Sequence, residues 1–130
     1  MQVKEIMNKV ITIKPDATIK DAADLMSKKR FGCLVVVDEE KIVGIITERD
    51  ILSKVEAKGK SGKSVLVKDI MSEKVVTTEP NENIDDAALL MSKNKIKKLP
   101  VIDNDKLVGI ITSTDIIKNS DRINESYFFS

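Results

Sequence analysis

Two short apolar runs, each carrying one glycine, stand out in the hydrophobic pattern of the chain. Both runs end at a threonine, and an aspartate follows three residues later. The β-branched composition and the length of each run predict a short buried strand. The Thr-x-x-Asp that follows predicts a helix start, with threonine as N-cap and aspartate at the third helical position. The two copies are Val43-Gly44-Ile45-Ile46-Thr47-Glu48-Arg49-Asp50 and Val108-Gly109-Ile110-Ile111-Thr112-Ser113-Thr114-Asp115.

The pattern around these runs also repeats, at a period of about 65 residues, with about half of the aligned positions identical. Val3-Lys4-Glu5-Ile6-Met7 matches Val67-Lys68-Asp69-Ile70-Met71, and Asp21-Ala22-Ala23 matches Asp86-Ala87-Ala88. The sequence therefore predicts a tandem duplication, with one repeat and its linker over residues 1–64 and the second repeat with a tail over 65–130.

Each repeat is predicted to be a β-α-β-β-α unit. A short strand precedes a proline, a helix follows with an N-cap and an aspartate at its third position, and two strands then form a hairpin before the closing helix. The predicted strands are residues 10–13, 34–37, 75–78 and 99–102 with the two runs above, and the predicted capping pairs are Thr18 with Asp21 and Asn83 with Asp86.

Composition narrows the possible functions. The 130 residues carry 22 lysines and arginines against 21 aspartates and glutamates, so no overall charge attracts nucleic acid or a membrane surface. Histidine and tryptophan are absent, which argues against His-based catalysis, a transition-metal site and base stacking. The single cysteine, Cys33, excludes an internal disulfide and indicates a reducing compartment. We therefore expect a cytoplasmic protein without a membrane span, a metal site or an enzymatic activity.

The duplicated unit, with Gly-Ile-Ile-Thr-x-x-Asp closing the third strand and Leu99-Pro100-Val101 opening the second, resembles the CBS domain family, named after cystathionine β-synthase. The resemblance covers the chain from Val3 to about Lys118. It implies an α+β fold in which two CBS repeats, a Bateman module, pack through their sheets with pseudo-two-fold symmetry. It also implies two clefts that bind AMP, ADP, ATP or S-adenosylmethionine, with NAD ranked after these, and a homodimer.

The resemblance assigns roles at the strand-to-helix junctions. Asp50 and Asp115 would accept hydrogen bonds from the ribose diol, because an ionised carboxylate is an acceptor only. Thr47 and Thr112 would donate to phosphate beside the helix N-terminus, and Arg49 lies within reach of the phosphate. Thr114 occupies the position of Arg49 in repeat two.

The adenine would lie between the first strand and the start of the second. These residues are Ile11, Thr12, Gly32 and Cys33 in repeat one and Val76, Thr77, Lys97 and Lys98 in repeat two. Glu48 would repel phosphate in repeat one, whereas Lys97 and Lys98 would attract it in repeat two, so the clefts are not expected to be equivalent. We expect both to bind.

Two functions remain open at this point. The first is a regulatory module that senses an adenosine ligand, needs no cofactor and acts on an unknown partner protein. The alternative is a scaffold without ligand, in which each Thr-x-x-Asp only caps a helix, the glycines allow close packing and Cys33 is a small core residue. Tyr127-Phe128-Phe129 suggests docking on a partner, or a disordered tail.

Overall fold

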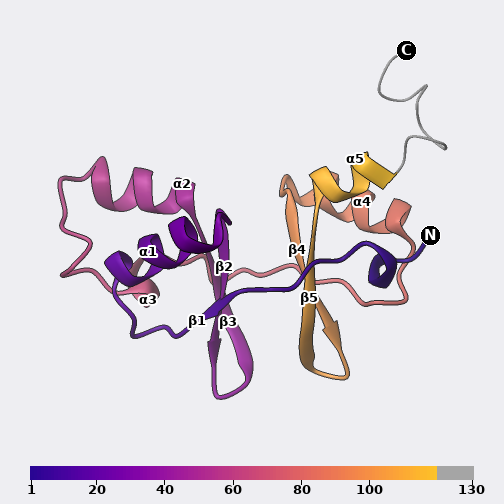
Figure 1. The fold of residues 1–130 in the computed structure, drawn as a ribbon, viewed down its shortest axis with the longest axis horizontal. Coiled ribbons are helices and arrows are strands. Elements are labelled where there is room, and N and C mark those ends of the chain that lie inside the picture. Colours follow the sequence, from indigo (N-terminus) through magenta and orange to yellow (C-terminus); the bar gives the residue numbers. More distant parts are fainter. Residues whose placement is uncertain (120–130) are drawn as a thin grey trace, which may run out of the picture. The chain divides into compact units, whose positions relative to one another are not determined.

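The computed structural model describes residues 1–119, which form two compact units, each described by itself below. The first-repeat unit is Ile11–Val75, and the second-repeat unit combines Met1–Val10 with the chain from Val76 onward. In Figure 1 the indigo N-terminal segment accordingly runs beside the orange strands β4 (Lys98–Asp103) and β5 (Lys106–Thr112). Each unit thus takes its opening segment from the other repeat of the sequence.

The first-repeat unit is a three-stranded sheet with helices. Strand β2 lies in the middle, parallel to β1 and antiparallel to β3, and the hairpin from β2 to β3 contains a bulge. The core is aliphatic, with Leu34, Val36 and Ile46 fully buried against Ile19 and Ala22 of the first helix. The elements are β1 (Thr12–Ile13), α1 (Ile19–Lys29), β2 (Cys33–Asp38), β3 (Lys41–Thr47), α2 (Glu48–Ile51), a π-helical continuation η2 (Leu52–Glu56) and α3 (Val67–Ile70).

The second-repeat unit repeats this plan with a two-stranded sheet, β4 and β5, paired antiparallel. Leu99, Val101 and Ile111 are fully buried, together with Val3 from the N-terminal segment and Ala87 from α4. The other elements are η1 (Val3–Glu5), α4 (Ile84–Asn94) and α5 (Ser113–Asn119).

The first predicted strand of each repeat is shorter than expected. Residues 10–13 form a strand only at Thr12–Ile13, and residues 75–78 make only a single bridge, from Thr78 to Val101. Proline explains part of the difference. In the first-repeat unit the N–H of Val35 donates to the carbonyl of Ile11, and the equivalent residue in β4 is Pro100, which has no N–H.

The predicted capping box is confirmed in α1 and wrong in α4. Thr18 Oγ1 accepts from the N–H of Asp21, whose carboxylate accepts from the N–H of Thr18. In α4, Asn83 instead accepts from the N–H of Asp85, at the second helical position. An N-cap side chain can reach either the second or the third N–H, and this choice leaves the carboxylate of Asp86 without a role in the cap.

Glycines allow the opening segment of each unit to lie against its hairpin. A Cβ atom at Gly44 would lie 2.5 Å from the sulfur of Met71, and one at Gly109 would lie 2.8 Å from the sulfur of Met7. Real Cβ atoms do not approach other heavy atoms this closely, so the close-packing role expected for both glycines is confirmed.

Candidate functional site

The strand-to-helix junction of the second-repeat unit holds Asp115 in a fixed position. Its Oδ2 accepts from the backbone N–H of Thr112 at 2.9 Å and from the hydroxyl of Thr112 at 2.8 Å. The N–H of Asp115 in turn donates to Thr112 Oγ1 at 3.2 Å. This is the capping box that the sequence predicts, and it fixes the rotamer of the carboxylate.

Asn8 adds a third hydrogen bond to the same oxygen, which sequence reasoning missed. Its side-chain amide donates to Asp115 Oδ2 at 2.7 Å, and its backbone exchanges two hydrogen bonds with Ile110 in β5. Asn8 lies 107 residues from Asp115 in the chain, and no local pattern points to such a contact. Within residues 1–119 the hydrogen bonds to this carboxylate all end at Oδ2, so Oδ1 can accept hydrogen bonds from a ligand.

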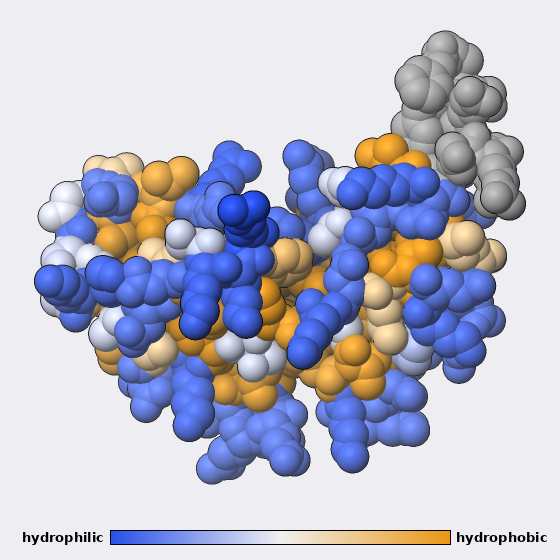
Figure 2. All heavy atoms as spheres, viewed as in Figure 1, coloured by the Kyte–Doolittle hydropathy of each residue, from blue (hydrophilic) through white to orange (hydrophobic). Residues whose placement is uncertain are grey.

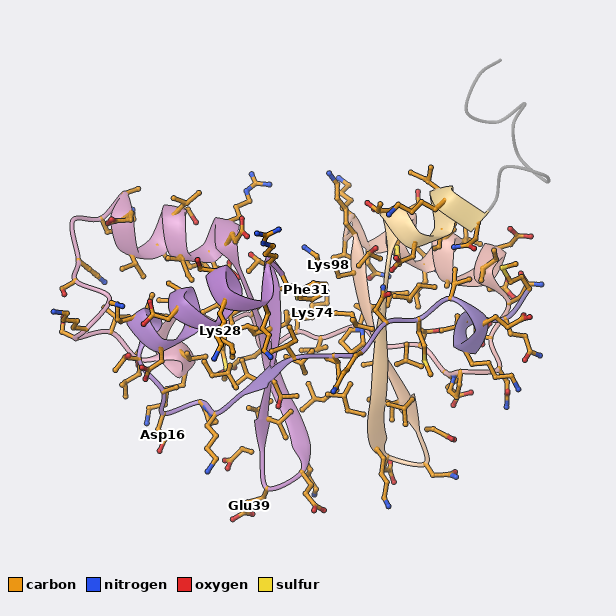
Figure 3. All side chains as sticks on the ribbon, viewed as in Figure 1. Asp16, Lys28, Phe31, Glu39, Lys74 and Lys98 are labelled. Atoms are coloured by element: carbon orange, nitrogen blue, oxygen red, sulfur yellow. The ribbon has the colours of Figure 1, made fainter. Side chains whose placement is uncertain are left out.

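The predicted lysines lie at the same end of the hairpin. Lys98 is the first residue of β4 and pairs across the sheet with Thr112, and Figure 3 labels it there. The carbonyl of Lys97 accepts from the N–H of Ser113 at 2.9 Å. The structure therefore brings Lys97, Lys98, Thr112 and Asp115 together, and Thr114 is exposed on the first turn of α5.

The equivalent junction of the first-repeat unit has the same capping box, but the second carboxylate oxygen of its aspartate has different surroundings. Asp50 Oδ2 accepts from the N–H of Thr47 at 2.9 Å and from its hydroxyl at 3.1 Å. Asp50 Oδ1 lies 3.3 Å from the ammonium of Lys54, which also donates to the carbonyl of Ile70. A ligand that uses Oδ1 must therefore share it with Lys54, or displace that side chain.

Glu48 also affects which ligands this junction can accept. A side chain at Gly32 would come within 2.9 Å of the Glu48 carboxylate oxygen, so the carboxylate lies directly over the backbone of Gly32. The N–H of Glu48 also donates to the carbonyl of Gly32 at 3.0 Å. The start of β2, where the adenosine was predicted to bind, thus has a negative charge beside it, which disfavours phosphate.

The remaining predicted residues lie in different surroundings. Cys33 is fully buried, as expected for a core residue, and Arg49 is exposed beside Asp50. The carbonyl of Ile11 and the backbone of Thr12 are used in pairing with β2. Val76 packs against the core of the second-repeat unit, and Thr77 lines a separate pocket near the β4–β5 turn. The contact of the predicted residues in the first strand and at the start of the second strand of each repeat with adenine stays a prediction.

Among residues 1–119, no three acidic or cysteine side chains are arranged so that they could hold a metal ion together. Nor is any helix in that part of the chain long and apolar enough to cross a membrane.

Comparison with protein families identifies the fold. The model of the CBS domain matches residues 3–57 and again 67–122. The chain belongs to the CBS domain family. Both matches contain a complete Thr-x-x-Asp junction, so the predicted family and its duplication are confirmed.

The chain is similar to CBS proteins of several kinds. It is 36% identical to the CBS domain-containing protein YhcV of Bacillus subtilis, over 90% of this chain and 84% of that protein. It is 38% identical to inosine-5'-monophosphate dehydrogenase of Nitrosopumilus maritimus over 88% of this chain, which corresponds to 23% of the enzyme.

Solved structures agree with this assignment. A putative signal-transduction protein with CBS domains from Burkholderia ambifaria has a TM-score of 0.85 and 33% identity, covering 96% of both chains. The CBS domain pair of protein MJ0100, solved in complex with 5'-methylthioadenosine and S-adenosyl-L-methionine, has a TM-score of 0.82 and 38% identity, covering 91% of this chain and 94% of its own.

Proposed function

We propose that this CBS pair is a regulatory module that binds an adenosine-containing ligand and has no catalytic activity of its own. The described residues hold two preformed carboxylates, Asp50 and Asp115, each fixed by a capping box at a strand-to-helix junction. A structural neighbour with 38% identity binds two adenosine compounds. A buried single cysteine, Cys33, accords with a reducing compartment such as the cytoplasm.

One observation carries the proposal. The three hydrogen bonds to Asp115 Oδ2 hold the carboxylate in one orientation and leave Oδ1 available as an acceptor. An ionised carboxylate can accept both hydroxyls of a ribose, and hydrogen bonds to a charged group are strong. Because the second-repeat junction also has Lys97 and Lys98 at the adjoining strand, it favours a phosphorylated ligand such as AMP, ADP or ATP.

The first-repeat junction favours a different ligand of the same class. Glu48 over Gly32 is repelled by phosphate but attracts a sulfonium, the cationic group of S-adenosylmethionine. Asp50 remains the ribose acceptor there, after Lys54 moves aside. Displacing Lys54 breaks its ion pair with Asp50, whose side chain is 19% exposed, and its hydrogen bond to the carbonyl of Ile70, so the ligand's own hydrogen bonds must offset both.

Thermal unfolding tests the proposal. The melting temperature of the protein is measured with AMP, ADP, ATP, NAD, 5'-methylthioadenosine and S-adenosylmethionine. A ligand present at a hundred times its dissociation constant adds about 2.7 kcal/mol of stability, which raises the melting temperature by several degrees. Guanosine and cytidine monophosphates serve as controls. No rise with any adenosine compound would contradict the proposal and favour a scaffold function.

We also propose that the module forms a homodimer through the exposed faces of α4 and α5. Leu89 on α4 is 67% exposed and Ile117 on α5 is 51% exposed, and the two helices pack against each other. Figure 2 shows hydrophobic atoms reaching the surface among the charged side chains. An exposed apolar side chain on each of two contacting helices is consistent with an interaction surface. A hexameric CBS-CP12 protein from cyanobacteria, 36% identical, shows that a related chain assembles.

Light scattering after size-exclusion chromatography tests the dimer. The double variant Leu89→Lys with Ile117→Lys is expected to elute as a monomer, because charges placed in an apolar interface are desolvated on association. Its melting temperature should change little at low protein concentration, because both side chains are exposed. Val108→Lys, an exposed apolar position on β5 that is 40% exposed, is the matched control and should remain dimeric. An unchanged mass of the double variant would place the interface elsewhere.

A further inference from the structure

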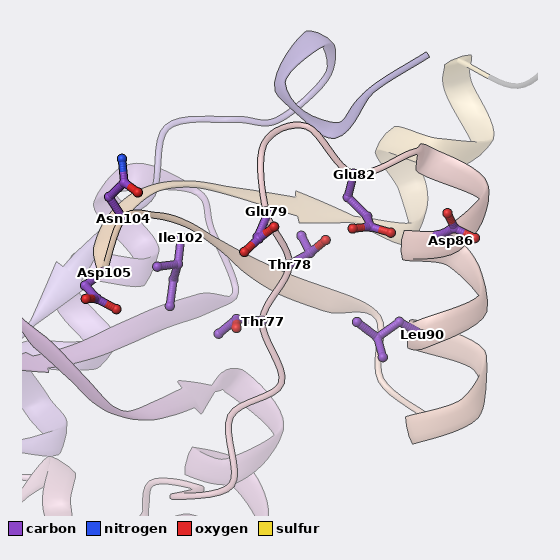
Figure 4. A pocket seen from close by; sticks show the side chains of 9 residues that line it. All are labelled: Thr77, Thr78, Glu79, Glu82, Asp86, Leu90, Ile102, Asn104 and Asp105. Carbon is purple, nitrogen blue, oxygen red and sulfur yellow. The ribbon is translucent and has the colours of Figure 1, made fainter.

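The second-repeat unit contains a pocket near the β4–β5 turn, at the end of the hairpin away from Thr112 and Asp115. Its volume is about 730 Å³, within the usual range of small-molecule sites. Four carboxylates and three other polar side chains line it, together with two apolar side chains, Leu90 and Ile102. The polar lining residues are Thr77, Thr78, Glu79, Glu82, Asp86, Asn104 and Asp105 (Figure 4).

Thr78 presents a polar group to this pocket from a nearly buried position. The residue is 6% exposed and lines the pocket, and within residues 1–119 its hydroxyl makes no hydrogen bond. Every fully buried side-chain oxygen among the described residues has a partner, so this hydroxyl keeps access to the pocket. In Figure 4 its oxygen points toward the carboxylate of Glu82. The hydroxyl can therefore hydrogen-bond to water in the pocket or to a ligand group that replaces that water.

The carboxylates of the pocket are also uncompensated. The ion pairs found in residues 1–119 are Lys20–Asp24 and Lys54–Asp50, and neither involves a pocket residue. Among residues 1–119, neither a lysine nor an arginine lines the pocket. Asp86, whose equivalent in α1 completes a capping box, has no part in the cap of α4. Several carboxylates around one concave surface give a negative potential that attracts cations.

The other repeat shows that the fold does not need this arrangement. At the equivalent positions repeat one has Ile13 for Thr78, Lys14 for Glu79 and Ala17 for Glu82. The same helix, strand and hairpin form around these residues. The first-repeat unit has a pocket with carboxylates too, but Lys14 and Lys68 line it. An acidic lining without a lysine, together with the Thr78 hydroxyl, therefore distinguishes the second-repeat unit, and the fold does not require it.

We propose that this pocket binds a small organic cation of the polyamine class, at a site separate from the adenosine junctions. Ammonium groups would bind the carboxylates and donate to Thr78 Oγ1, and the methylene segments would lie on Leu90 and Ile102. A directly coordinated metal ion is disfavoured, because the described carboxylates do not come together as a group of three ligands. The pocket shares Thr77 with the predicted adenine contact, but none of its lining residues belongs to the junctions at Asp50 and Asp115, so the site does not depend on the adenosine proposal.

Calorimetric titration of the full chain with putrescine and with spermidine tests this proposal at a salt concentration of about 0.15 M. Both amines are expected to bind, spermidine more tightly. The double variant Glu79→Lys with Glu82→Ala, which installs the residues of repeat one, is expected to lose binding with its fold retained. Glu82→Gln should weaken binding about tenfold, and Thr78→Val between about twofold and tenfold without lowering the melting temperature.

A matched control distinguishes binding in the pocket from nonspecific attraction of cations to an acidic surface. Asp85→Asn removes the same charge from the adjacent residue of α4, which does not line the pocket, and should change affinity by less than about twofold. Equal weakening by Asp85→Asn and Glu82→Gln would overturn the proposal. So would the absence of heat with either amine, or magnesium chloride binding as tightly as spermidine.

Discussion

In the Asp115→Asn variant, an adenosine ligand that stabilises the wild-type protein is expected to bind at least about tenfold more weakly. Hydrogen bonds to a charged group contribute about 1.5–3 kcal/mol, which corresponds to about tenfold to a hundredfold in the dissociation constant. Asparagine has the same shape as aspartate but presents one amide nitrogen, a donor, in place of an acceptor oxygen. The measurement is a titration of each variant with the ligand that gives the largest thermal shift.

The variant is designed to keep the helix cap. The amide oxygen of asparagine can still accept from the N–H and hydroxyl of Thr112, and its backbone N–H still donates to Thr112 Oγ1. The hydrogen bonds from Thr112 and Asn8 would then end on a neutral amide oxygen in place of a charged carboxylate. We therefore expect the free energy of unfolding to fall by about 1 kcal/mol. Binding and stability should therefore change by clearly different amounts.

Asp21→Asn is the control for capping alone. Thr18 and Asp21 form the same Thr-x-x-Asp box in α1, and Asp21 lies outside both candidate junctions. It should lower the melting temperature no more than Asp115→Asn does, because Asp21 accepts one hydrogen bond where Asp115 accepts three, and it should leave the affinity unchanged. Equal affinity of Asp115→Asn and the wild type would contradict the ribose role.

Asp50→Asn separates the two junctions. Lys54 already occupies Asp50 Oδ1, and Glu48 lies over Gly32, so the first-repeat junction is the weaker site for a phosphorylated ligand. Asp50→Asn should therefore weaken the affinity for AMP less than Asp115→Asn does. If S-adenosylmethionine instead depends on Asp50 and AMP on Asp115, one chain senses two adenosine compounds at separate junctions.

The family, the duplication and the hairpins could be predicted from sequence because each depends on local pattern. Thr47 with Asp50 and Thr112 with Asp115 lie only three residues apart, and their capping boxes form as expected. The difference between the two aspartates was also visible in the sequence. Lys54 follows Asp50 by one helical turn, and Asn119 stands at the equivalent position after Asp115.

Contacts between distant segments could not be predicted in this way. Met7 and Asn8 read as part of repeat one, yet they pack on Gly109 and bind Asp115 in the second-repeat unit. Which hairpin an opening segment joins depends on tertiary packing, and both repeats offer an equivalent glycine. The loss of a ladder hydrogen bond at Pro100 likewise needs the strand register before it can be inferred.

This exchange of opening segments predicts the effect of deleting residues 1–10. The deletion is expected to unfold the second-repeat unit and to leave residues 11–75 folded, because the segment belongs to the second-repeat unit. Val3 is fully buried there, and full burial of such a side chain stabilises by about 1.5–3 kcal/mol. Hydrogen–deuterium exchange, followed by peptide, should show loss of protection in residues 76–119.

The hydrogen bonds of the segment add to this loss. The N–H groups of Val3 and Lys4 donate to the carbonyls of Glu82 and Pro80, and the backbone of Asn8 pairs with Ile110. Each such bond contributes about 1 kcal/mol, so the total approaches the 5–15 kcal/mol by which a domain is stable. Val3→Ala should lower the stability of the second-repeat unit by about 1–3 kcal/mol, and the loss of exchange protection should again be confined to residues 76–119. Protection lost first in residues 11–75 would contradict the exchange, and would mean that the opening segment stabilises its own repeat.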